Sequence, residues 1–398
     1  MIGFKHDVCV IGGCGHVGLP LSIMLAHAGK KVCIQDINTE AIALIQSGRM
    51  PFLEEGAESL LAEVLANGNL SLSDDPGVIR ESEAIILIIG TPVDEFLNPR
   101  VSDMKKAMDV YGQLFVDGQL LILRSTLYPG TSQMINGWLK DKRLRIDVAF
   151  CPERIAEGRA IQELKQLPQI ISAFNESGYR RARELFGSLT DDLIDVEPME
   201  AELAKLFTNS WRYLKFSIAN QFYMIANDYG VDYYKIHHAM THNYPRAMDL
   251  PKPGFAAGPC LFKDTMQLAA FYGNNFYLGH AAMLVNEGMP NYIVRSLKKR
   301  GDISGKTVGI IGMAFKANSD DKRSSLSYKL RKILETECRK VLCTDIYIQD
   351  PSFLPLDEVI ERADLLILGV PHREYADIDT RGKEMVDVWN YYNRGARI

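Results

Sequence analysis

The sequence lacks the features that mark membrane, secreted and nucleic-acid-binding proteins. No apolar run reaches the ~20 residues that a membrane-spanning helix needs, so we expect no membrane partner. The opening residues, MIGFKHDVCVIGGCG, lack the charged, apolar and small-residue regions of a signal peptide. The basic residues are scattered and the net charge is −5, which argues against nucleic acid as a partner. We therefore expect a cytoplasmic protein.

The cysteines also exclude several classes of protein. There are 7 of them, widely spread, and none forms a CxxC pair. This pattern predicts neither a zinc ribbon nor a disulfide framework, so we expect a reducing compartment and no metal site. With 47% hydrophobic and 24% charged residues over 398 positions, the composition is that of a globular protein with two or three domains.

Short apolar runs alternate with amphipathic segments in the first part of the chain, as in a parallel sheet covered by helices. The predicted strands are residues 7–11, 31–35, 84–89, 119–123 and 146–150. The predicted helices include residues 19–28, 39–47, 103–115 and 131–140. These segments form the first α/β unit.

The pattern changes near residue 197. Residues 199–227 carry apolar side chains at helical spacing without glycine or proline, which predicts one long helix that spans domains or builds a dimer interface. Further helical segments continue to about residue 300 and are interrupted by a Pro- and Gly-rich loop at residues 243–259. A second α/β unit follows, with strands predicted at residues 307–311, 340–344, 364–370 and 385–388.

A glycine turn follows the first predicted strand and leads into a predicted helix. Residues 13–18 read GCGHVG, in which Gly13 permits a tight turn, Gly15 lets backbone approach a pyrophosphate, and Gly18 lets the helix pack closely on the strand. The pyrophosphate would lie at the helix N-terminus. Asp36 ends the second strand, where a carboxylate binds ribose hydroxyls and repels a 2′-phosphate, so NAD is favoured over NADP. A turn without ligand and a flavin site are the alternatives.

These patterns predict an α/β fold with two Rossmann-like parallel-sheet domains, joined by a long central helix and a helical middle domain. The expected boundaries are residues 1–196, 197–301 and 302–398. In the second unit, residues 309–314 read GIIGMA and lack the full glycine fingerprint. That unit therefore binds a different nucleotide or none.

Cys260 stands out among the cysteines because it ends a glycine-containing loop, PGFAAGPCLFKD at residues 253–264. A helix is predicted to begin near Asp264. A thiol close to a helix N-terminus and to Lys263 would have a lowered pKa and more thiolate character. The alternative is a small buried packing residue, which is the commoner role of cysteine.

Seven segments occur in the order found in one enzyme family. They are DVCVIGGCGHVGLP (residues 7–20), GTPVD (90–94), STLYPG (125–130), CPERIAEG (151–158), AELAKLFTN (201–209), GPCLFKD (258–264) and FKANSDDKR (315–323). With them the chain resembles the UDP-glucose/GDP-mannose dehydrogenase family over nearly its whole length. The resemblance implies NAD-dependent oxidation of the C6 hydroxyl of a UDP-sugar to a uronic acid. It also implies a UDP-sugar-binding third domain and a homodimer formed through the long helix.

The resemblance implies catalytic roles for six residues. Cys260 matches the nucleophile that forms a thiohemiacetal and then a thioester. Lys205 and Asn209, four apart on the long helix, would stabilise the oxyanion. Asp264 matches an acid that accepts a proton from water or alcohol. Glu153 is the other candidate base, together with Thr126, whose hydroxyl can hold a water; the two carboxylates remain unranked.

Binding roles implied by the resemblance are more widely spread. Beyond the glycines and Asp36, the expected cofactor contacts are His16, Val17, Thr91, Pro92, Thr126, Glu157, Lys263 and Arg323. The expected substrate contacts are Glu153, Arg154, Lys205, Asn209, Arg246, Phe255, Gly258 and Lys316. A guanidinium such as that of Arg246 suits a diphosphate or a pair of sugar hydroxyls.

The sequence departs from its family in the loop before Cys260, which reads GFAAGPC where many members have GFGGSC or GVGGHC. The CPERIAEG and NYPR segments favour a UDP-N-acetylhexosamine, whereas LFKD after Cys260 favours UDP-glucose, so both substrates stay open. Two other functions compete with this interpretation. One is a two-electron sugar or 3-hydroxyacid dehydrogenase, which needs no cysteine, and the other is a non-catalytic nucleotide-binding redox sensor.

Overall fold

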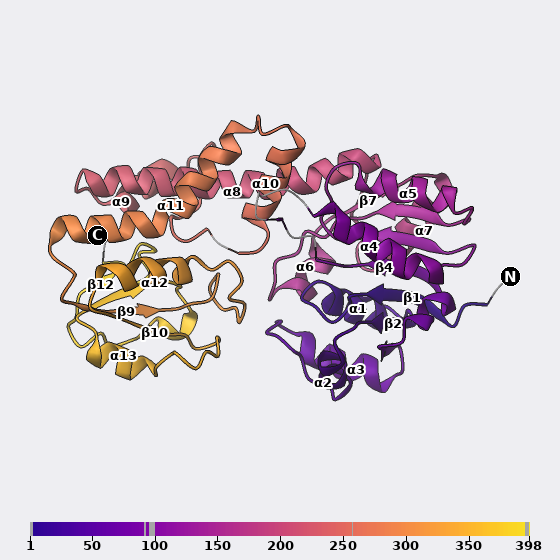
Figure 1. The fold of residues 1–398 in the computed structure, drawn as a ribbon, viewed down its shortest axis with the longest axis horizontal. Helices are drawn as coiled ribbons and strands as arrows, with labels where there is room; N and C mark the ends of the chain where they lie inside the picture. Colours follow the sequence, from indigo (N-terminus) through magenta and orange to yellow (C-terminus); the bar gives the residue numbers. More distant parts are fainter. Residues whose placement is uncertain (1–2, 91–92, 95–99, 257, 395–397) are drawn as a thin grey trace. The chain divides into compact units, whose positions relative to one another are not determined.

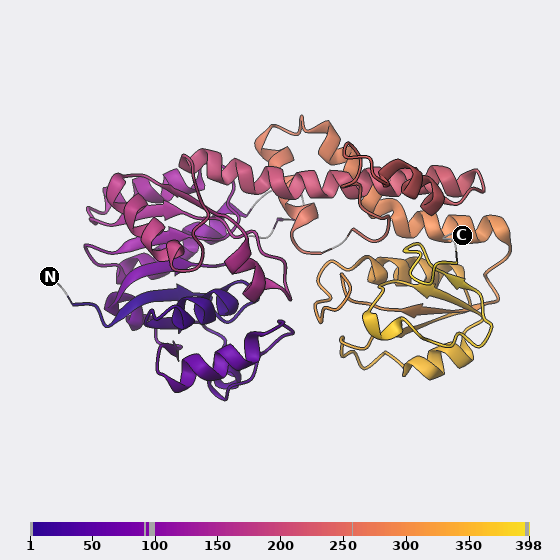
Figure 2. The ribbon, with the colours of Figure 1, turned by 180° about the vertical axis from the view of Figure 1, so that it is seen from behind.

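The chain divides into two compact units, Met1–Thr208 and Asn209–Ile398. The computed structural model describes residues 3–90, 93–94, 100–256, 258–394 and 398. Each unit is built on its own sheet, seen from one side in Figure 1 and from behind in Figure 2. The boundary between the units falls within the long helix α8 (Pro198–Asp228).

Within the described residues, the first unit contains a sheet of eight strands. They are β1 (His6–Ile11), β2 (Val32–Gln35), β3 (Leu70–Ser73), β4 (Ser82–Leu87), β5 (Leu120–Leu123), β6 (Asp147–Phe150), β7 (Gln169–Ala173) and β8 (Leu193–Asp195). Their order is β3-β2-β1-β4-β5-β6-β7-β8, and the pairing is parallel except between β6 and β7. The carboxyl ends of β1, β4, β5 and β6 therefore meet at one edge, where ligands bind in this kind of sheet.

Helices cover both faces of this sheet. They are α1 (Gly18–His27), α2 (Thr39–Gln46), α3 (Ala57–Ala66), α4 (Val101–Tyr111), α5 (Thr131–Asp141), α6 (Ala160–Gln166) and α7 (Glu176–Gly187), with 3-10 turns at Pro76–Glu81 and Gly112–Leu114. Val8 and Val10 pack in the core under α1, whereas Cys9 and Ile11 pack in the core under α4 and α5. Because both faces are buried, central strands such as β4 and β5 are mostly apolar instead of alternating.

The second unit has a smaller sheet with its own helices. Its elements are α9 (Tyr233–Thr241), α10 (Leu261–Phe271), α11 (Tyr277–Arg300), β9 (Thr307–Ile311), α12 (Leu326–Glu337), β10 (Lys340–Thr344), α13 (Leu356–Arg362), β11 (Leu365–Leu368), a 3-10 turn at Arg373–Tyr375 and β12 (Met385–Val386). The strands lie in the order β10-β9-β11-β12 and are all parallel. Helices α11 and α12 share one core with the sheet, and α13 packs on its other face.

The predicted fold class is confirmed: two parallel-sheet units of α/β type accompany a long helix of 31 residues, α8. The predicted strands at residues 307–311 and 340–344 coincide with β9 and β10. The edge strands β3 and β8 were not predicted, because short edge strands bury few apolar residues and leave a weak pattern. The internal antiparallel strand β7 was not predicted either, although most of its residues are buried. The division into three domains stays a prediction.

No helix among the described residues is both long enough and apolar enough to cross a bilayer.

Candidate active site

The glycine turn after β1 is formed by close backbone packing. Gly12 has φ +72°, and a Cβ there would overlap the carbonyl oxygen of Ile88. A Cβ on Gly18 would lie 2.6 Å from the Cα of Gly13. Gly15 is different, because nothing lies within 4 Å of its Cβ position. The turn therefore holds α1 tightly against the strand and leaves open space at Gly15, as pyrophosphate binding at a helix N-terminus requires.

Asp36 follows β2 and faces this turn. Its Oδ2 accepts the backbone N–H of Cys14 at 2.9 Å, and its Oδ1 accepts that of Asn38 at 3.0 Å. The residue is partly exposed, so its oxygens can accept further hydrogen bonds from a ligand. This position, the open Gly15 and the N-terminus of α1 together fit the ribose and pyrophosphate of NAD.

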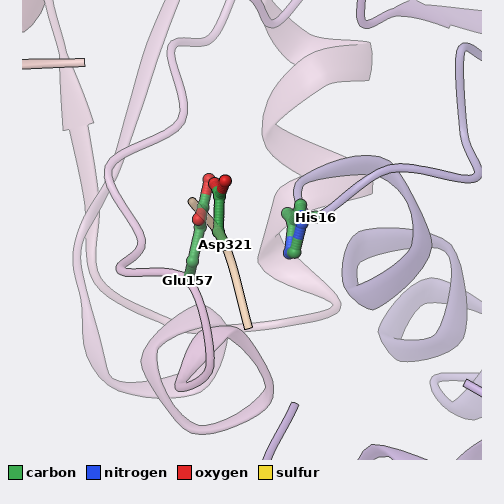
Figure 3. Close-up of side chains that lie close together, drawn as sticks. All are labelled: His16, Glu157 and Asp321. Atoms are coloured by element: carbon green, nitrogen blue, oxygen red, sulfur yellow. The ribbon is translucent and has the colours of Figure 1, made fainter. Parts of the chain in front are cut away.

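Two predicted cofactor contacts approach each other in the first unit. Figure 3 shows His16 on the turn before α1 and Glu157 on the loop after β6, and their ligand atoms lie within 4.8 Å of each other. The His16 ring also stacks on Phe52 at a centroid distance of 4.0 Å. The CPERIAEG segment therefore borders the glycine turn. The predicted contacts Thr91 and Pro92 lie outside the described residues.

Cys260 is the exposed member of the seven cysteines. It is the N-cap residue of α10, and its carbonyl oxygen accepts the N–H of Asp264 at 2.9 Å. Burial raises the pKa of all six other thiols, and that of Cys14, Cys151 and Cys343 rises to about 12. A thiol reacts as its thiolate, so these six are poor candidates for a nucleophile, and the exposed Cys260 is the better one.

Asp264 is fully buried one helical turn after Cys260. Its Oδ2 accepts a hydrogen bond from Nδ2 of Asn209 at 2.5 Å, and Nζ of Lys263 lies 3.4 Å from its Oδ1. Oδ1 accepts no hydrogen bond from the described residues. The second unit thus brings four predicted site residues together: Cys260, Lys263, Asp264 and Asn209.

Lys205 lies four residues before Asn209 on α8, so helix geometry puts the two on one face. Lys205 belongs to the first unit and Asn209 to the second. In the first unit, buried Glu202 on the same helix accepts the N–H groups of Gly130 and Ser132 at 2.6 and 2.8 Å. Glu202 therefore ties α8 to the start of α5, directly after the STLYPG segment.

Glu153 is 7% exposed and binds the side chain of Arg124. Arg124 directly follows β5, two residues before Thr126, and is among the largest fully buried side chains. Arg124 was not predicted as a site residue, although a charged residue directly after the apolar run LLIL was a usable signal. A buried guanidinium requires a buried anion, and Glu153 supplies it.

The loop before Cys260 is anchored at two glycines in the second unit. Gly254 has φ +147° and donates its N–H to buried Asn220 at 2.8 Å. Gly258 has φ +106°, and its Cβ position lies 2.6 Å from the ring of Phe315. Phe255 is 5% exposed and packs in the core of the unit. These contacts define the path of the loop that carries Cys260.

The remaining predicted contacts occupy different environments. Nη2 of Arg154 donates a hydrogen bond to the carbonyl oxygen of Pro168. Burial lowers the pKa of the Arg154 side chain. Arg246 is exposed and lies over the ring of Tyr244. Lys316 lies over the ring of Phe315, and Arg323 forms a bidentate pair with Asp321. Val17 and Thr126 are partly buried.

Three consecutive parts of the chain match the domains of one known enzyme family, in agreement with this geometry. The UDP-glucose/GDP-mannose dehydrogenase family matches with its NAD binding domain at residues 6–190, its central domain at residues 199–288 and its UDP binding domain at residues 309–394. The chain therefore belongs to the UDP-glucose/GDP-mannose dehydrogenase family. The resemblance read from the seven segments is confirmed.

Individual relatives show which UDP-sugar dehydrogenases the chain is similar to. The UDP-N-acetyl-D-mannosamine dehydrogenase of Pyrococcus horikoshii is 31% identical over 94% of this chain and 92% of its own. A structure of the P. horikoshii UDP-D-ManNAc dehydrogenase has a TM-score of 0.88 at 29% identity, covering 95% of this chain and 93% of its own. A UDP-glucose dehydrogenase from Pyrobaculum islandicum has a TM-score of 0.89 at 25% identity, covering 98% and 95%.

Membership of the family settles the class of reaction. The chain is an oxidoreductase that uses NAD and acts on UDP-sugars, as predicted. The parallel sheet with the glycine turn is its NAD binding domain, and the sheet after α11 is its UDP binding domain.

Proposed function

We propose that this enzyme oxidises the C6 hydroxyl of a UDP-N-acetylhexosamine to the carboxylate in two steps, through a thioester on Cys260. One observation carries this proposal: Cys260 is the exposed thiol of the chain and lies at the N-terminus of α10, one turn before buried Asp264. A two-electron dehydrogenase has no use for such a thiol. The redox-sensor alternative does not account for a buried carboxylate beside it.

The chemistry needs a nucleophile and a proton acceptor from the chain. In the first oxidation a hydride leaves C6 and the hydroxyl proton passes to a base, which gives an aldehyde. The Cys260 thiolate then adds to the aldehyde carbon, and loss of a second hydride from the thiohemiacetal leaves a thioester. Water adds to the thioester carbonyl, its proton passes to the base, and cleavage of the C–S bond releases the acid and the thiolate.

Asp264 is the stronger of the two candidate bases. Its Oδ1 has lone pairs not used by hydrogen bonds from the described residues, whereas both oxygens of Glu153 already accept two donors each. A base must have a lone pair that the proton can reach. We therefore give Asp264 the proton-accepting role.

Lys205 and Asn209 are proposed to stabilise the oxyanions of the thiohemiacetal and of thioester hydrolysis. The side-chain amide of Asn209 has two N–H donors and gives one of them to Asp264. Its other N–H remains for the substrate oxygen. A cation and an amide on one face of α8 suit developing negative charge.

NAD fits the residues of the first unit. The open position at Gly15 and the partly exposed carboxylate of Asp36 would hold the pyrophosphate and the adenosine ribose. His16, Val17, Glu157 and Thr126 border the same edge of the sheet in our proposal. When bound, NAD supplies the hydride acceptor for each oxidation.

The sugar is proposed from the relatives, two of which are UDP-N-acetyl-D-mannosamine dehydrogenases at 31% and 30% identity. UDP-N-acetyl-D-mannosamine is therefore the first substrate to test. UDP-glucose is the second candidate, favoured by the likeness to the P. islandicum structure. A panel of these two with UDP-N-acetylglucosamine, UDP-N-acetylgalactosamine and GDP-mannose distinguishes them by kcat/KM. A preference for UDP-glucose would overturn the proposed sugar and leave the mechanism intact.

The stoichiometry of NADH tests the mechanism. We expect two NADH per sugar consumed and a uronic acid as product, and a ratio of one would contradict the thioester route. Cys260→Ser should lower kcat by at least about 100-fold because the hydroxyl is a far weaker nucleophile. The matched control is Cys338→Ser, a partly buried thiol whose replacement should leave kcat unchanged.

We also propose a homodimer formed through α8. In the second unit, apolar side chains repeat along one exposed stripe of this helix: Trp211, Ile218, Phe222 and Ile225, followed by exposed Tyr229 just after the helix. A groove of about 370 Å³ between α8 and α9 continues the stripe. Exposed apolar surface of this extent is typical of an interface. The facing helix of a second copy would cover it.

The oligomeric state tests this surface. Ile225→Asp should convert the dimer to a monomer in sedimentation analysis, because a carboxylate would be buried without a partner. The control Ile346→Asp changes an exposed residue outside the stripe, and this variant should remain dimeric. A wild-type chain that sediments as a monomer would contradict the proposal.

A further inference from the structure

Three strand ends of the UDP binding domain carry residues that bind one another. The segment FKANSDDKR follows β9, Asp345 directly follows β10, and His372 follows β11. These strands are neighbours in the order β10-β9-β11 and run parallel. Their carboxyl ends therefore meet at one edge, where ligands bind in this kind of sheet.

His372 is enclosed at this edge. Its side chain is 0% exposed. The rings of Tyr347 and Tyr375 lie edge-on to the imidazole at centroid distances of 4.9 and 5.3 Å. The hydroxyl of Tyr391 donates to the backbone carbonyl of His372 at 2.9 Å. A ring enclosed in this way does not turn freely, so each of its two nitrogen atoms faces one fixed partner.

The two ring nitrogens of His372 have opposite roles. Nδ1 lies 2.9 Å from the backbone nitrogen of Asn318. A backbone N–H can only donate, so Nδ1 is an acceptor and the ring proton is on Nε2. Nε2 lies 3.2 Å from Oδ2 of Asp345. The aspartate therefore orients the ring, and the ring holds the N–H of Asn318.

Lys316 lies between two residues that this network holds. Oδ2 of Asp345 also accepts the N–H of Ala314 at 3.0 Å, two residues before the lysine. Nδ1 of His372 accepts the N–H of Asn318, two residues after it. The backbone on both sides of Lys316 is thus bound to one buried pair of side chains. The position of this backbone decides where the lysine side chain begins.

A second hydrogen bond joins the same two segments. Asn318 has φ +55°, a left-handed conformation that asparagine tolerates. Its Oδ1 accepts the N–H of Arg373 at 3.0 Å. This bond does not involve the ring of His372, so a change of the ring alone leaves it in place. We therefore expect such a change to shift the turn that carries Lys316 without unfolding it.

We propose that His372 is a positioning residue for Lys316, and that Asp345 orients it for this role. Through the N–H of Asn318, the imidazole fixes the turn from which the Lys316 ammonium reaches the UDP-sugar. This inference rests on the proposed function, together with the expected substrate contact of Lys316. It assigns to His372 an effect on UDP binding and none on the chemistry at Cys260.

Two replacements of His372 separate the roles of its nitrogens. The amide oxygen of an asparagine stands near the place of Nδ1, so His372→Asn can still accept from Asn318 but loses Asp345. The amide nitrogen of a glutamine stands near the place of Nε2, so His372→Gln can still donate to Asp345 but leaves the N–H of Asn318 without its acceptor. We expect the Kd for UDP, measured by calorimetric titration, to rise about tenfold in His372→Gln and less than about twofold in His372→Asn.

Turnover and NAD binding provide the controls. The KM for the UDP-sugar should rise in His372→Gln, and kcat should change far less, because the groups around Cys260 are unaltered. The Kd for NAD should stay the same in both variants, because the NAD site belongs to the first unit. Both variants lose a buried hydrogen bond and part of the ring volume, so Tm should fall in both. A general loss of stability therefore does not account for a difference in UDP binding between them.

A double-mutant cycle tests whether His372 acts through Lys316. Lys316→Met removes the ammonium and should itself weaken UDP binding. In that background, His372→Gln should raise the Kd for UDP by less than about twofold more, whereas independent effects would multiply. Effects that multiply, a Lys316→Met variant that binds UDP like the wild type, or equal Kd values for His372→Gln and His372→Asn would each overturn the inference.

If the His372 variants do not fold, the wild-type protein decides. NMR of isotope-labelled histidine nitrogens at mildly alkaline pH should show His372 with its proton on Nε2 and with Nδ1 hydrogen-bonded to the amide of Asn318. A proton on Nδ1 would contradict the inference. A wild-type enzyme that binds UDP but makes no uronic acid would instead refute the proposed function and leave the effect of His372 on UDP binding intact.

Discussion

The two sheets each end their first strand in a glycine with positive φ, but the chain that follows differs. Gly12 has φ +72° after β1, and Gly312 has φ +91° after β9. In the first unit α1 begins six residues later at Gly18, whereas in the second unit α12 begins only at Leu326. A pyrophosphate site needs the helix N-terminus directly after the turn. The first turn therefore suits a dinucleotide, and the second does not.

The aspartates that follow the neighbouring strands differ between the two units in the same way as the two turns. Asp36 accepts two backbone N–H groups and stays partly exposed. Asp345 is enclosed: its Oδ2 accepts from Met313, Ala314 and the His372 ring, and its Oδ1 from Tyr347 and Ile348. A carboxylate with free lone pairs can bind a ribose, whereas a saturated one stabilises the turn.

The strongest test of this comparison is Gly312→Ala. An alanine there would adopt a left-handed conformation, and its Cβ would lie 2.6 Å from the carbonyl oxygen of Val370. We expect the free energy of unfolding to fall by about 3 kcal/mol or more. Urea denaturation measures the loss, and hydrogen exchange should localise it to β9 and β10. An unchanged stability would show that the second turn is not under this constraint.

Asp345→Asn should have the next largest effect. The amide cannot accept all five hydrogen bonds, so buried N–H groups lose their partner and the free energy of unfolding falls by about 2–3 kcal/mol. Asp36→Asn is the matched control: it should change stability by less than about 1 kcal/mol and weaken NAD binding instead. Equal destabilisation by the two variants would remove the distinction between a structural and a ligand-binding aspartate.

Gly15→Ala should act on cofactor binding alone. Nothing lies within 4 Å of the added Cβ, so stability should not change. The methyl group would stand where backbone approaches the pyrophosphate, and we expect the Kd for NAD to rise about tenfold, or about 1.4 kcal/mol. Calorimetric titration with NAD measures this Kd. Unchanged affinity would place the pyrophosphate away from this turn.

The smallest effect concerns pH. Burial raises the pKa of Asp345, but the hydrogen bond and charge of His372 and the backbone N–H groups outweigh burial, so the pKa lies below its ordinary value of 3.8. A carboxyl with a depressed pKa stabilises the fold above its unfolded pKa, and this contribution is lost as the pH falls through the folded pKa. Below about pH 4 the wild type should therefore lose stability more steeply than Asp345→Asn. Parallel curves would contradict the assignment.

Much of the fold was predictable because its signals are local. The apolar run of β1, the glycines at 13, 15 and 18 and the spacing in α8 each fall within one segment, so periodicity and turn chemistry reveal them. The order of seven segments identified the family, and the family identified NAD and UDP-sugars. Cys260 was singled out as a candidate nucleophile by the same ordered segments, because its own neighbours in the chain left its role open.

The sequence by itself therefore determined the fold class and the cofactor of this protein. Only the tertiary structure decided which hydrogen-bond donors surround each carboxylate. Arg124 lies 29 residues before Glu153, Asn209 lies 55 before Asp264, and Asp345 lies 27 before His372. The number of donors around a carboxylate depends on which distant segments the fold brings to it. Local sequence patterns do not reveal the number of donors around a carboxylate. That number decides whether a carboxylate oxygen is free to accept a proton.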